Sequence, residues 1–436
     1  MSPKKRPDFE LRSADWLSVA DARRRILGAA HPGPTERVPA LDALGRALAE
    51  DLVATATLPP WDNSAMDGYA VRGEDVWGAS DTSRVHLKVV GRTRAGEQAH
   101  GPLGPGEAVR IMTGAPVPEG CDTVIRVEDT DAEGEPGRVV VRSDRDRGRN
   151  VRPRGEDMEL GDRLLGQGTA VTPGVVGLLA TLGRSEVVVR AQPTVAILTT
   201  GDELRGPERF DDVRAGGGVP ESNGPMIAAA ARRSGAVPLS LGLVRDEREA
   251  LKEAIGSGTR AQALVVVGGA SVGEADLVKR ILGELGFRED FWRVKMRPGS
   301  PFGFGSLPVD HGPLPVFSLP GNPASAFVTF EVLVRPFLLR LGGHERVLRR
   351  RVRAVVETHL EGARDLTLFP RVTVRRQVDR LLVSSPGPQG SGLVRGLSVA
   401  DGLAVIPEGI AEVREGQEVE VMLLDDSPGG EPWDGT

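Results

Sequence analysis

The chain has 436 residues, with 61 acidic and 55 basic side chains and a formal net charge of −6 at pH 7, which argues against general nucleic-acid binding because that function needs a basic face. The single cysteine, Cys121, excludes an intramolecular disulfide and a cysteine-based zinc site. No apolar run reaches the ~18 residues of a membrane span, and no apolar segment follows the basic start, so we expect a soluble, cytoplasmic protein of about three domains.

Residues up to 190 are predicted to form short helices around an inserted β domain. A helix begins near residue 15 and ends at Pro32-Gly33-Pro34, and a second short helix covers residues 41–52. From 69 to 152 short apolar runs alternate with Gly, Pro and Asp, which predicts strands at 85–90, 108–112, 123–127 and 138–141. Residues 153–190 return to mixed structure, with a helix near 173–182 and a strand at 186–190.

From residue 191 buried strands alternate with helices. Strands are predicted at 195–199, 237–243, 263–267 and 315–319, and helices at 225–233, 246–256, 277–285 and 324–341. This alternation is typical of a doubly wound parallel sheet. The pattern is β again from about 346 to 424, and an acidic tail rich in Pro and Gly follows.

Three strand-to-helix turns of this sheet carry glycine and polar residues. They read Thr200-Gly201-Asp202-Glu203, Gly268 to Asp276, and Leu319 to Ser325. Ligands of an open parallel sheet bind outside the carboxyl ends of its strands. Glycine lets the backbone approach a ligand, and helix starts offer free N–H groups to an anion. We therefore expect a phosphate-type cradle at this edge.

Carboxylates gather at the same edge, namely Asp202, Glu203, Asp246, Glu274 and Asp276. A carboxylate and a phosphate repel each other by about 1 kcal/mol at 4 Å in bulk water and by more when desolvated. A hard divalent cation between them removes the conflict, and oxygen-only ligands favour Mg²⁺ over zinc.

Basic residues follow in Trp292-Arg293-Val294-Lys295-Met296-Arg297. If this segment is a strand, Arg293, Lys295 and Arg297 share one face, and with the nearby Ser300 they form a plausible oxyanion site. Each motif also has a purely structural interpretation. The basic face could be solvated, the glycine loop merely tight, Asp67 a residue that bonds its own backbone, and Thr113 a strand-end turn residue.

Several motifs together are more specific than any one of them. In order, the chain has Pro60 to Ala70 (PWDNSAMDGYA), Arg110 to Asp122 (RIMTGAPVPEGCD), Arg154-Gly155-Glu156-Asp157, Thr200 to Leu204, Ser222-Asn223, Gly268 to Asp276 and Leu319 to Pro323. This series closely resembles the molybdopterin molybdenumtransferase family, which includes MoeA and the gephyrin E domain, over about residues 14–424.

The resemblance implies a multidomain fold of α/β and β parts. It comprises a discontinuous elongated domain (12–60 and 153–190), a β insert domain (61–152), an α/β domain like that of the molybdopterin adenylyltransferases (191–345) and a C-terminal β barrel (346–425). Residues 426–436 are expected to form a disordered tail.

The resemblance also implies a reaction and an assembly. Family members convert adenylyl-molybdopterin and molybdate into molybdenum cofactor and AMP with Mg²⁺, and they are homodimers whose active cleft lies between subunits. The expected partners are small-molecule substrates, with contacts to a molybdopterin adenylyltransferase and to molybdoenzymes, and neither nucleic acid nor membrane. Positioning and electrostatics should dominate the catalysis.

By motif position, the resemblance assigns catalytic roles to Asp67, Thr113, Asp157, Glu203, Asp246 and Asp276, of which Glu203, Asp246 and Asp276 would also hold the metal. The residues expected to bind substrate are Gly268, Gly269, Ser271, Gly273, Arg293, Lys295, Arg297, Ser300, Pro320, Gly321, Pro323 and Ser391.

The sequence departs from the family pattern at the segment expected to bind the oxyanion. Where many relatives have Lys-Pro-Gly-Lys-Pro, this chain has Arg297-Pro298-Gly299-Ser300-Pro301, and Arg293 replaces an upstream lysine. Arginine is a planar fork rather than a point charge, and the charge at 300 is lost, so the choice between molybdate and tungstate stays open. Two other functions fit parts of the sequence: a molybdopterin adenylyltransferase, which needs only a unit like 191–341, and a non-catalytic scaffold like the gephyrin E domain.

Overall fold

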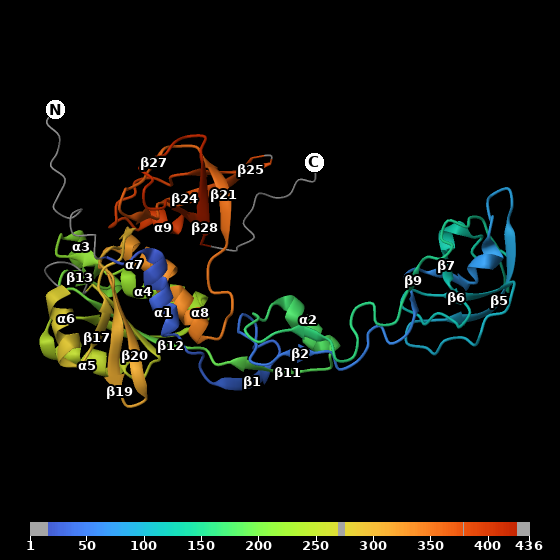
Figure 1. The fold of residues 1–436 in the computed structure, drawn as a ribbon, viewed down its shortest axis with the longest axis horizontal. Coiled ribbons are helices and arrows are strands. Elements are labelled where there is room, and N and C mark those ends of the chain that lie inside the picture. The colour runs from blue at the N-terminus through green and yellow to red at the C-terminus, as the bar shows by residue number, and fades with distance from the viewer. Residues whose placement is uncertain (1–15, 269–274, 378, 425–436) are drawn as a thin grey trace. The chain divides into compact units, whose positions relative to one another are not determined.

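The computed structural model describes residues 16–268, 275–377 and 379–424 (Figure 1). The side chains of Ala275 and Asp276 also lie outside this description, as does the tail at 426–436. The contacts divide the chain into two compact units. One comprises residues 51–166 and 178–184, so residues 51–60 and 153–166 group with the β insert, and the other comprises the rest of the chain. None of the described helices is long and apolar enough to cross a membrane.

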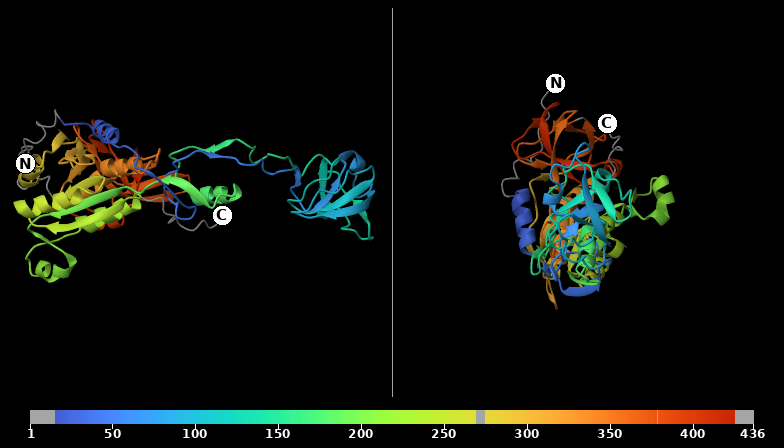
Figure 2. Two further views of the ribbon diagram at one scale, coloured as in Figure 1. Left: turned by 90° about the horizontal axis from the view of Figure 1, so that it is seen from below. Right: turned by 90° about the vertical axis from the view of Figure 1, so that its right-hand side faces the viewer.

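The smaller unit is built on a five-stranded sheet in the order β7-β4-β6-β5-β8, which Figures 1 and 2 draw from blue to cyan. Its strands are β4 (Gly68–Val71), β5 (Val85–Thr93), β6 (Glu107–Ile111), β7 (Thr123–Arg126) and β8 (Arg138–Val141). The four strands predicted between 85 and 141 are thus confirmed. Shorter elements are β2 (Leu52–Val53), β3 (Asn63–Ser64), η2 (Gly73–Val76), η3 (Val127–Asp129), β9 (Val151–Arg152) and β10 (Arg163–Leu165).

The α/β part of the larger unit has a six-stranded sheet in the order β15-β12-β16-β20-β19-β17. Its strands are β12 (Thr194–Thr200), β15 (Val237–Val244), β16 (Ala263–Val267), β17 (Arg288–Phe291), β19 (Gly303–Val309) and β20 (Gly312–Leu319). The first four strands of the order are parallel, as predicted. The last two, β19 and β17, are antiparallel additions that the sequence pattern did not reveal.

Both faces of the central strands are buried, which confirms the doubly wound architecture. In β12, Val195 and Ile197 belong to one hydrophobic core and Ala196 and Leu198 to another. Helices α5 (Arg248–Gly258) and α6 (Ala275–Glu284) contribute to the second core. The first core lies on the other face and includes residues of α1 (Val19–Gly28), α4 (Asn223–Arg233), α7 (Pro323–Thr329) and α8 (Arg335–Leu341) (Figure 1).

The helical segment predicted at 324–341 forms, but it contains a π-helical stretch, η5 (Phe330–Val334), between α7 and α8. Pro336 follows this stretch at the start of α8. Proline has no N–H to donate to the carbonyl four residues earlier, so a regular α-helical register could not continue through this point without a missing bond. The widened turn thus coincides with the place where an α-helical bond is unavailable.

The helix predicted at 41–52 is wrong. Residues 41–45 form a turn with Leu41 exposed, and isolated bridges follow at Ala47 and Leu48. The backbone N–H groups of Gly45 and Leu48 donate to Val171 and Thr169 respectively, so pairing with distant segments replaces the helical bonds. The first helix begins at Val19 rather than near residue 15, because the Ser18 hydroxyl caps it by accepting from the Asp21 N–H.

A closed barrel completes the larger unit, in the order β21-β25-β24-β26-β28. Its strands are β21 (Arg351–Val356), β24 (Arg371–Gln377), β25 (Arg380–Ser384), β26 (Gly402–Val405) and β28 (Glu418–Leu423). Remaining elements of this unit are β1 (Thr35–Pro39), β11 (Glu186–Arg190), β13 (Leu204–Arg205), η4 (Pro207–Arg209), α3 (Phe210–Arg214), β14 (Val219–Pro220), β18 (Met296–Arg297), β22 (Leu360–Glu361), β23 (Thr367–Leu368), α9 (Arg395–Ser398) and β27 (Glu412–Val413), and α2 is Pro173–Thr181.

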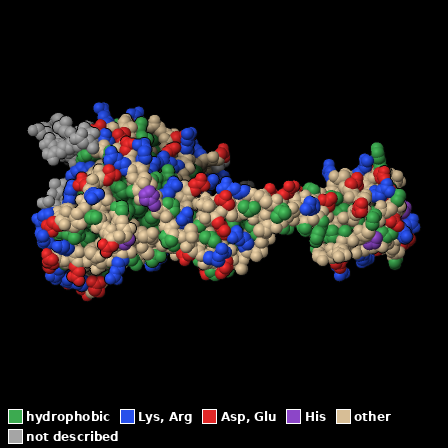
Figure 3. Space-filling model, turned by 60° about the horizontal axis from the view of Figure 1, so that its bottom comes forward, with side chains coloured by type: hydrophobic (Ala, Val, Ile, Leu, Met, Phe, Trp, Pro, Cys, Tyr) green, Lys and Arg blue, Asp and Glu red, His purple; other side chains and the backbone are tan. Residues whose placement is uncertain are grey.

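On the face drawn in Figure 3, basic and acidic side chains are interspersed rather than segregated. This mixture accords with the net charge of −6. This face shows no continuous basic stripe of the kind that binds phosphate backbones.

Candidate active site

The expected pocket lies at the carboxyl ends of β12, β16 and β20. It has a volume of about 780 Å³. Of the residues assigned from the motifs, Glu203, Gly268, Pro320, Gly321 and Pro323 line it. Ser222, Asn223 and Ser325 add polar groups, and Gly392 and Val394 come from the barrel. The carboxyl ends of the three strands therefore meet in one hollow.

Close backbone approach joins these turns. Gly268 has φ +114°, and a Cβ added there would lie 2.2 Å from the carbonyl oxygen of Thr200, so a larger residue does not fit. A Cβ added at Gly321 would lie 3.5 Å from the Gly268 Cα. Glycine at 268 thus lets the end of β16 lie against the end of β12, and Gly321 at the end of β20 is in ordinary van der Waals range of it.

The acidic residues lie beside the same edge. The Thr200 hydroxyl donates to Asp246 Oδ1, and the Asp246 N–H donates to Asp202 Oδ1 at 3.2 Å. Asp246 thus lies next to a pocket residue, although it is not itself among the lining residues. Gly269, Ser271, Gly273 and Glu274, and the side chain of Asp276, lie outside the described residues.

Asn223 is a pocket residue that the motif analysis did not single out for a role. It is 4% exposed, and its Nδ2 donates to the Gly321 carbonyl at 2.6 Å. That bond fixes the orientation of the amide, because Oδ1 in its place would repel the carbonyl. Oδ1 is buried and has no donor among the described residues. A buried acceptor in a pocket is satisfied by a donor on a ligand.

A second hollow of about 630 Å³ adjoins the first along residues 390–394. Arg297 and Ser391 line it, together with Pro298, His359 and Gln389. The Ser391 carbonyl accepts from the Ala324 N–H at 2.9 Å, so its loop is attached to the start of α7. The structure therefore brings Ser391 next to the Pro320–Pro323 turn.

The basic residues do not form one strand face. Only Met296 and Arg297 are in a strand, and the Met296 N–H donates back to the Val294 carbonyl. Burial does alternate, since Val294 and Met296 are fully buried. Arg293, however, packs over the Trp16 ring at 5.2 Å and lines a different hollow from Arg297. Lys295 is half-buried, and the buried Ser300 hydroxyl donates to the Met296 carbonyl, which occupies it within its own turn.

In the smaller unit, Asp67 and Thr113 are in direct contact. Asp67 Oδ1 accepts from the Thr113 N–H at 2.7 Å and from its hydroxyl at 2.8 Å. These two bonds, the backbone bond first, lower the pKa of Asp67 below its ordinary value. Asp157 is exposed, in a turn whose N–H donates to the Leu58 carbonyl. The Arg154 N–H donates to Asp62 Oδ1, so the motif at 154–157 adjoins the motif at 60–70.

Arg371 is a further residue that sequence reasoning missed. It is 2% exposed, and its guanidinium donates to the carbonyls of Leu393 at 2.9 Å, Pro388 at 3.1 Å and Gly390 at 3.2 Å. Burial lowers its pKa. Its only signal in the sequence is a cation next to apolar residues in a β pattern. Arg371 holds the loop that carries Ser391.

Comparisons with known proteins cover almost the whole chain. Three family models match it: "MoeA N-terminal region (domain I and II)" over residues 17–183, "Probable molybdopterin binding domain" over 196–340 and "MoeA C-terminal region (domain IV)" over 353–424. The molybdopterin molybdenumtransferase of Bacillus subtilis is 36% identical over 425 residues, which is 96% of each chain. The chain belongs to the MoeA family of molybdopterin molybdenumtransferases.

Other MoeA family members are also similar to this chain, in sequence or in structure. Molybdopterin molybdenumtransferase 2 of Mycobacterium tuberculosis is 37% identical over 393 residues, covering 89% of this chain and 94% of that protein. The crystal structure of the molybdopterin biosynthesis moeA protein from Pyrococcus horikoshii matches with a TM-score of 0.78 at 26% identity, covering 94% of this chain and all of that one. The multidomain fold of this MoeA family member therefore agrees with that of a solved relative.

The contact between Asp67 and Thr113 predicts the effect of Thr113→Val. This change removes the hydroxyl bond and keeps the backbone bond, so the pKa of Asp67 should rise but stay below its ordinary value. Because a depressed pKa stabilises the fold above the ordinary pKa and loses that effect as the pH falls through the folded pKa, the variant should lose this stabilisation at higher pH than the wild type. Carboxyl ¹³C NMR titration measures the shift of the Asp67 pKa, and Asp67→Asn identifies the Asp67 signal.

Thr82→Val, at an exposed threonine of the same unit, is the control. An unchanged Asp67 pKa in Thr113→Val would contradict the proposed effect of the Thr113 hydroxyl.

The carbonyl contacts of Arg371 predict that Arg371→Ala frees residues 388–393. An unsatisfied buried polar group costs about 1–3 kcal/mol, so amide hydrogen exchange in this loop should accelerate by about tenfold or more. Arg371→Lys keeps the positive charge but not the planar guanidinium, so its exchange rate in this loop should lie between those of the wild type and Arg371→Ala. The exposed Arg380→Ala in the same barrel should change nothing. Equal exchange in Arg371→Ala and wild type would show that the loop is held by other contacts.

Proposed function

We propose that this chain inserts molybdenum into molybdopterin, using adenylyl-molybdopterin and molybdate and releasing molybdenum cofactor and AMP. The observation that carries the proposal is the 780 Å³ pocket at the carboxyl ends of β12, β16 and β20, in a chain that matches molybdopterin molybdenumtransferases almost from end to end. An adenylyltransferase would need only the α/β part, whereas the family models also match 17–183 and 353–424.

The polar groups of the pocket suit a pterin phosphate. The buried Oδ1 of Asn223 lacks a donor among the described residues, and a pterin ring carries N–H groups that can supply one. Gly268 and Gly321 leave room for a ligand to approach the backbone. We assign to these residues the binding and orientation of adenylyl-molybdopterin, so that cleavage of the phosphoanhydride depends on positioning and electrostatics.

We assign Mg²⁺ to Glu203, Asp246 and Asp276. The carboxylates of Asp202, Glu203 and Asp246 near the end of β12 offer the oxygen donors that this ion prefers. The side chains that the structure describes include no group of three or more that could hold a metal, and the Asp276 side chain is outside that set. When bound, Mg²⁺ supplies neutralisation of phosphate charge.

We assign the molybdate contact to Arg297. Its guanidinium is exposed in the hollow that Ser391 also lines, beside the main pocket. A guanidinium fork can donate two parallel hydrogen bonds to a tetrahedral oxyanion. Arg293 is held over Trp16 in a separate hollow, so we expect Arg297→Ala to weaken molybdate use more than Arg293→Ala.

Release of AMP tests the function. With adenylyl-molybdopterin, molybdate and Mg²⁺, the wild type should release AMP, and Glu203→Gln should lower the rate by about 100-fold or more, as expected for loss of a charged group that acts at the reacting phosphates. Glu208→Gln, at an exposed glutamate nearby in the chain and outside the pocket lining, is the control. Consumption of ATP with free molybdopterin would identify an adenylyltransferase instead, and no turnover of either substrate would identify a scaffold.

We further propose a homodimer with Asp67 and Thr113 of one subunit acting with the α/β pocket of the other. Asp67→Asn and Glu203→Gln should each be inactive alone. Mixed one to one with subunit exchange, half of the dimers are mixed and each has one intact cleft, so activity should recover to about a quarter of wild type. No recovery, in mixtures shown by mass spectrometry to have exchanged subunits, would place both residues in one subunit's cleft.

A further inference from the structure

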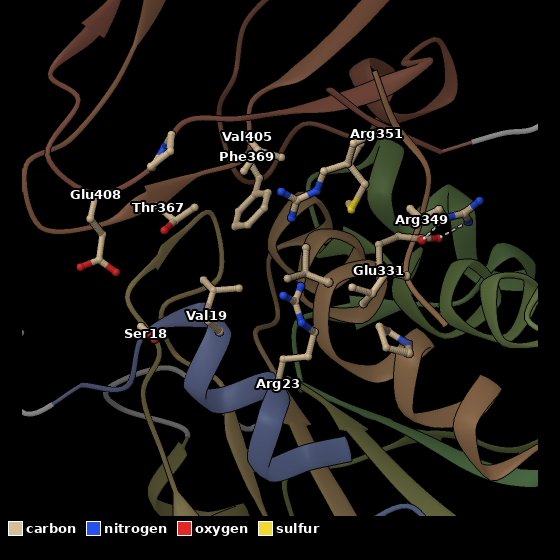
Figure 4. A pocket seen from close by; sticks show the side chains of 16 residues that line it. Ser18, Val19, Arg23, Glu331, Arg349, Arg351, Thr367, Phe369, Val405 and Glu408 are labelled. Atoms are coloured by element: carbon tan, nitrogen blue, oxygen red, sulfur yellow. Dashed lines mark hydrogen bonds and ion pairs between the residues drawn. The ribbon is translucent and has the colours of Figure 1, made fainter. Parts of the chain in front are cut away.

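A separate cavity lies where α1, the helical segment 331–336 and the barrel meet (Figure 4). Its volume is about 420 Å³, within the size range of small-molecule sites. It shares no lining residue with the two hollows assigned above. Its wall includes Arg23 of α1, Arg351 of β21, and Phe369 and Val405 of the barrel part.

Arg23 is the basic residue of this cavity wall whose charge has no partner among the described residues. Its side chain is half-buried and extends from α1 toward the cavity, and it has no ion pair or hydrogen bond with any residue that the structure describes (Figure 4). The neighbouring Arg349 is neutralised by Glu331, with N–O distances of 2.9 and 3.1 Å. Arg351 pairs at the surface with Glu420 at 2.8 Å. Glu331 also pairs with Arg335 at 3.8 Å, so it does not compensate Arg23.

The surroundings of Arg23 disfavour its positive charge. Burial, and then the positive charge of Arg351, lower the pKa of Arg23. A partly desolvated cation is stabilised by an anion at close range. The carboxylate of Glu408 lines the cavity too, but Figure 4 shows it beside Ser18 and Thr367, away from Arg23. The protein thus leaves room for an external anion beside Arg23 and Arg351.

The rest of the wall is apolar. Phe369, Val405 and Met422 of the barrel part line it together with Val19 and Val332, and Figure 4 shows Phe369 and Val405 on the opposite side from Val19. Phe369 and Val405 are at most 8% exposed. A ligand that fits has an oxyanion at one end and an apolar body at the other. Because Arg23 is the one basic group of the wall without a partner among the described residues, a singly charged carboxylate matches it better than a phosphate, which carries about −1.5 to −2 at pH 7.

We propose that this cavity binds a small organic monocarboxylate, with its carboxylate on the guanidinium groups of Arg23 and Arg351 and its apolar body against Phe369, Val405 and Met422. The guanidinium fork matches a carboxylate with two parallel hydrogen bonds. The site is independent of the proposed reaction.

Isothermal titration of the full chain with 4-phenylbutyrate tests the proposal. Saturable binding is expected, and the matched amide, 4-phenylbutyramide, should bind at least about tenfold more weakly because it lacks the charge. Arg23→Ala should also lose about tenfold or more, whereas Arg24→Ala should bind like wild type, since Arg24 lies on the same helix, is exposed and pairs with Asp21. Glu420→Gln should strengthen binding, because it frees Arg351.

The proposal would be overturned by no saturable binding, by equal binding of acid and amide, or by equal binding to wild type and Arg23→Ala. Tighter binding of inorganic phosphate than of phenylbutyrate would assign the site to a different anion class and overturn it as well. Circular dichroism of Arg23→Ala confirms the fold. AMP release by Arg23→Ala should match wild type, so failure here and failure of the proposed function are distinguishable.

Discussion

The two-sided burial of the central strands is the constraint on which the rest of the structure depends. Alternate residues of β12 and β16 enter two different cores, so neither strand can carry a polar side chain over most of its length. Polar residues are displaced to the ends, where Thr200, Glu203 and Asn223 gather. The position of the polar residues in the pocket is therefore a consequence of where the apolar packing of the strands ends.

The barrel contributes to two of the cavities. One short segment, 367–371, lines both of them. Thr367 and Phe369 line the cavity of Arg23, and Leu368 and Pro370 line the hollow of Arg297. The N–H groups of Thr367 and Phe369 donate to the Lys295 and Arg297 carbonyls at 3.0 and 2.8 Å. Arg371 then fixes the loop of Ser391. The position of Arg297 relative to Ser391 thus depends on backbone bonds between the two domains.

Sequence patterns predicted the parallel strands well, because a run such as 195–199 has few alternatives once it must be buried on both faces. They failed at 41–52, where apolar spacing suited a helix but the backbone bonds go to distant residues. Motifs located Glu203, Gly268 and Pro320 in one pocket. They could not separate Arg293 from Arg297, since the turn at Val294–Met296 depends on contacts with Leu17 and Ser300. The roles of Asn223 and Arg371 depend on their being buried, and the local sequence pattern does not reveal that these polar residues are buried.

A crystal structure of the chain with AMP, Mg²⁺ and molybdate tests the central claim most directly. The account predicts the AMP phosphate in the pocket of Glu203, Gly268 and Pro320, with molybdate on Arg297 nearby. Phosphate and molybdate bound on separate surfaces, with that pocket holding only solvent, would contradict it.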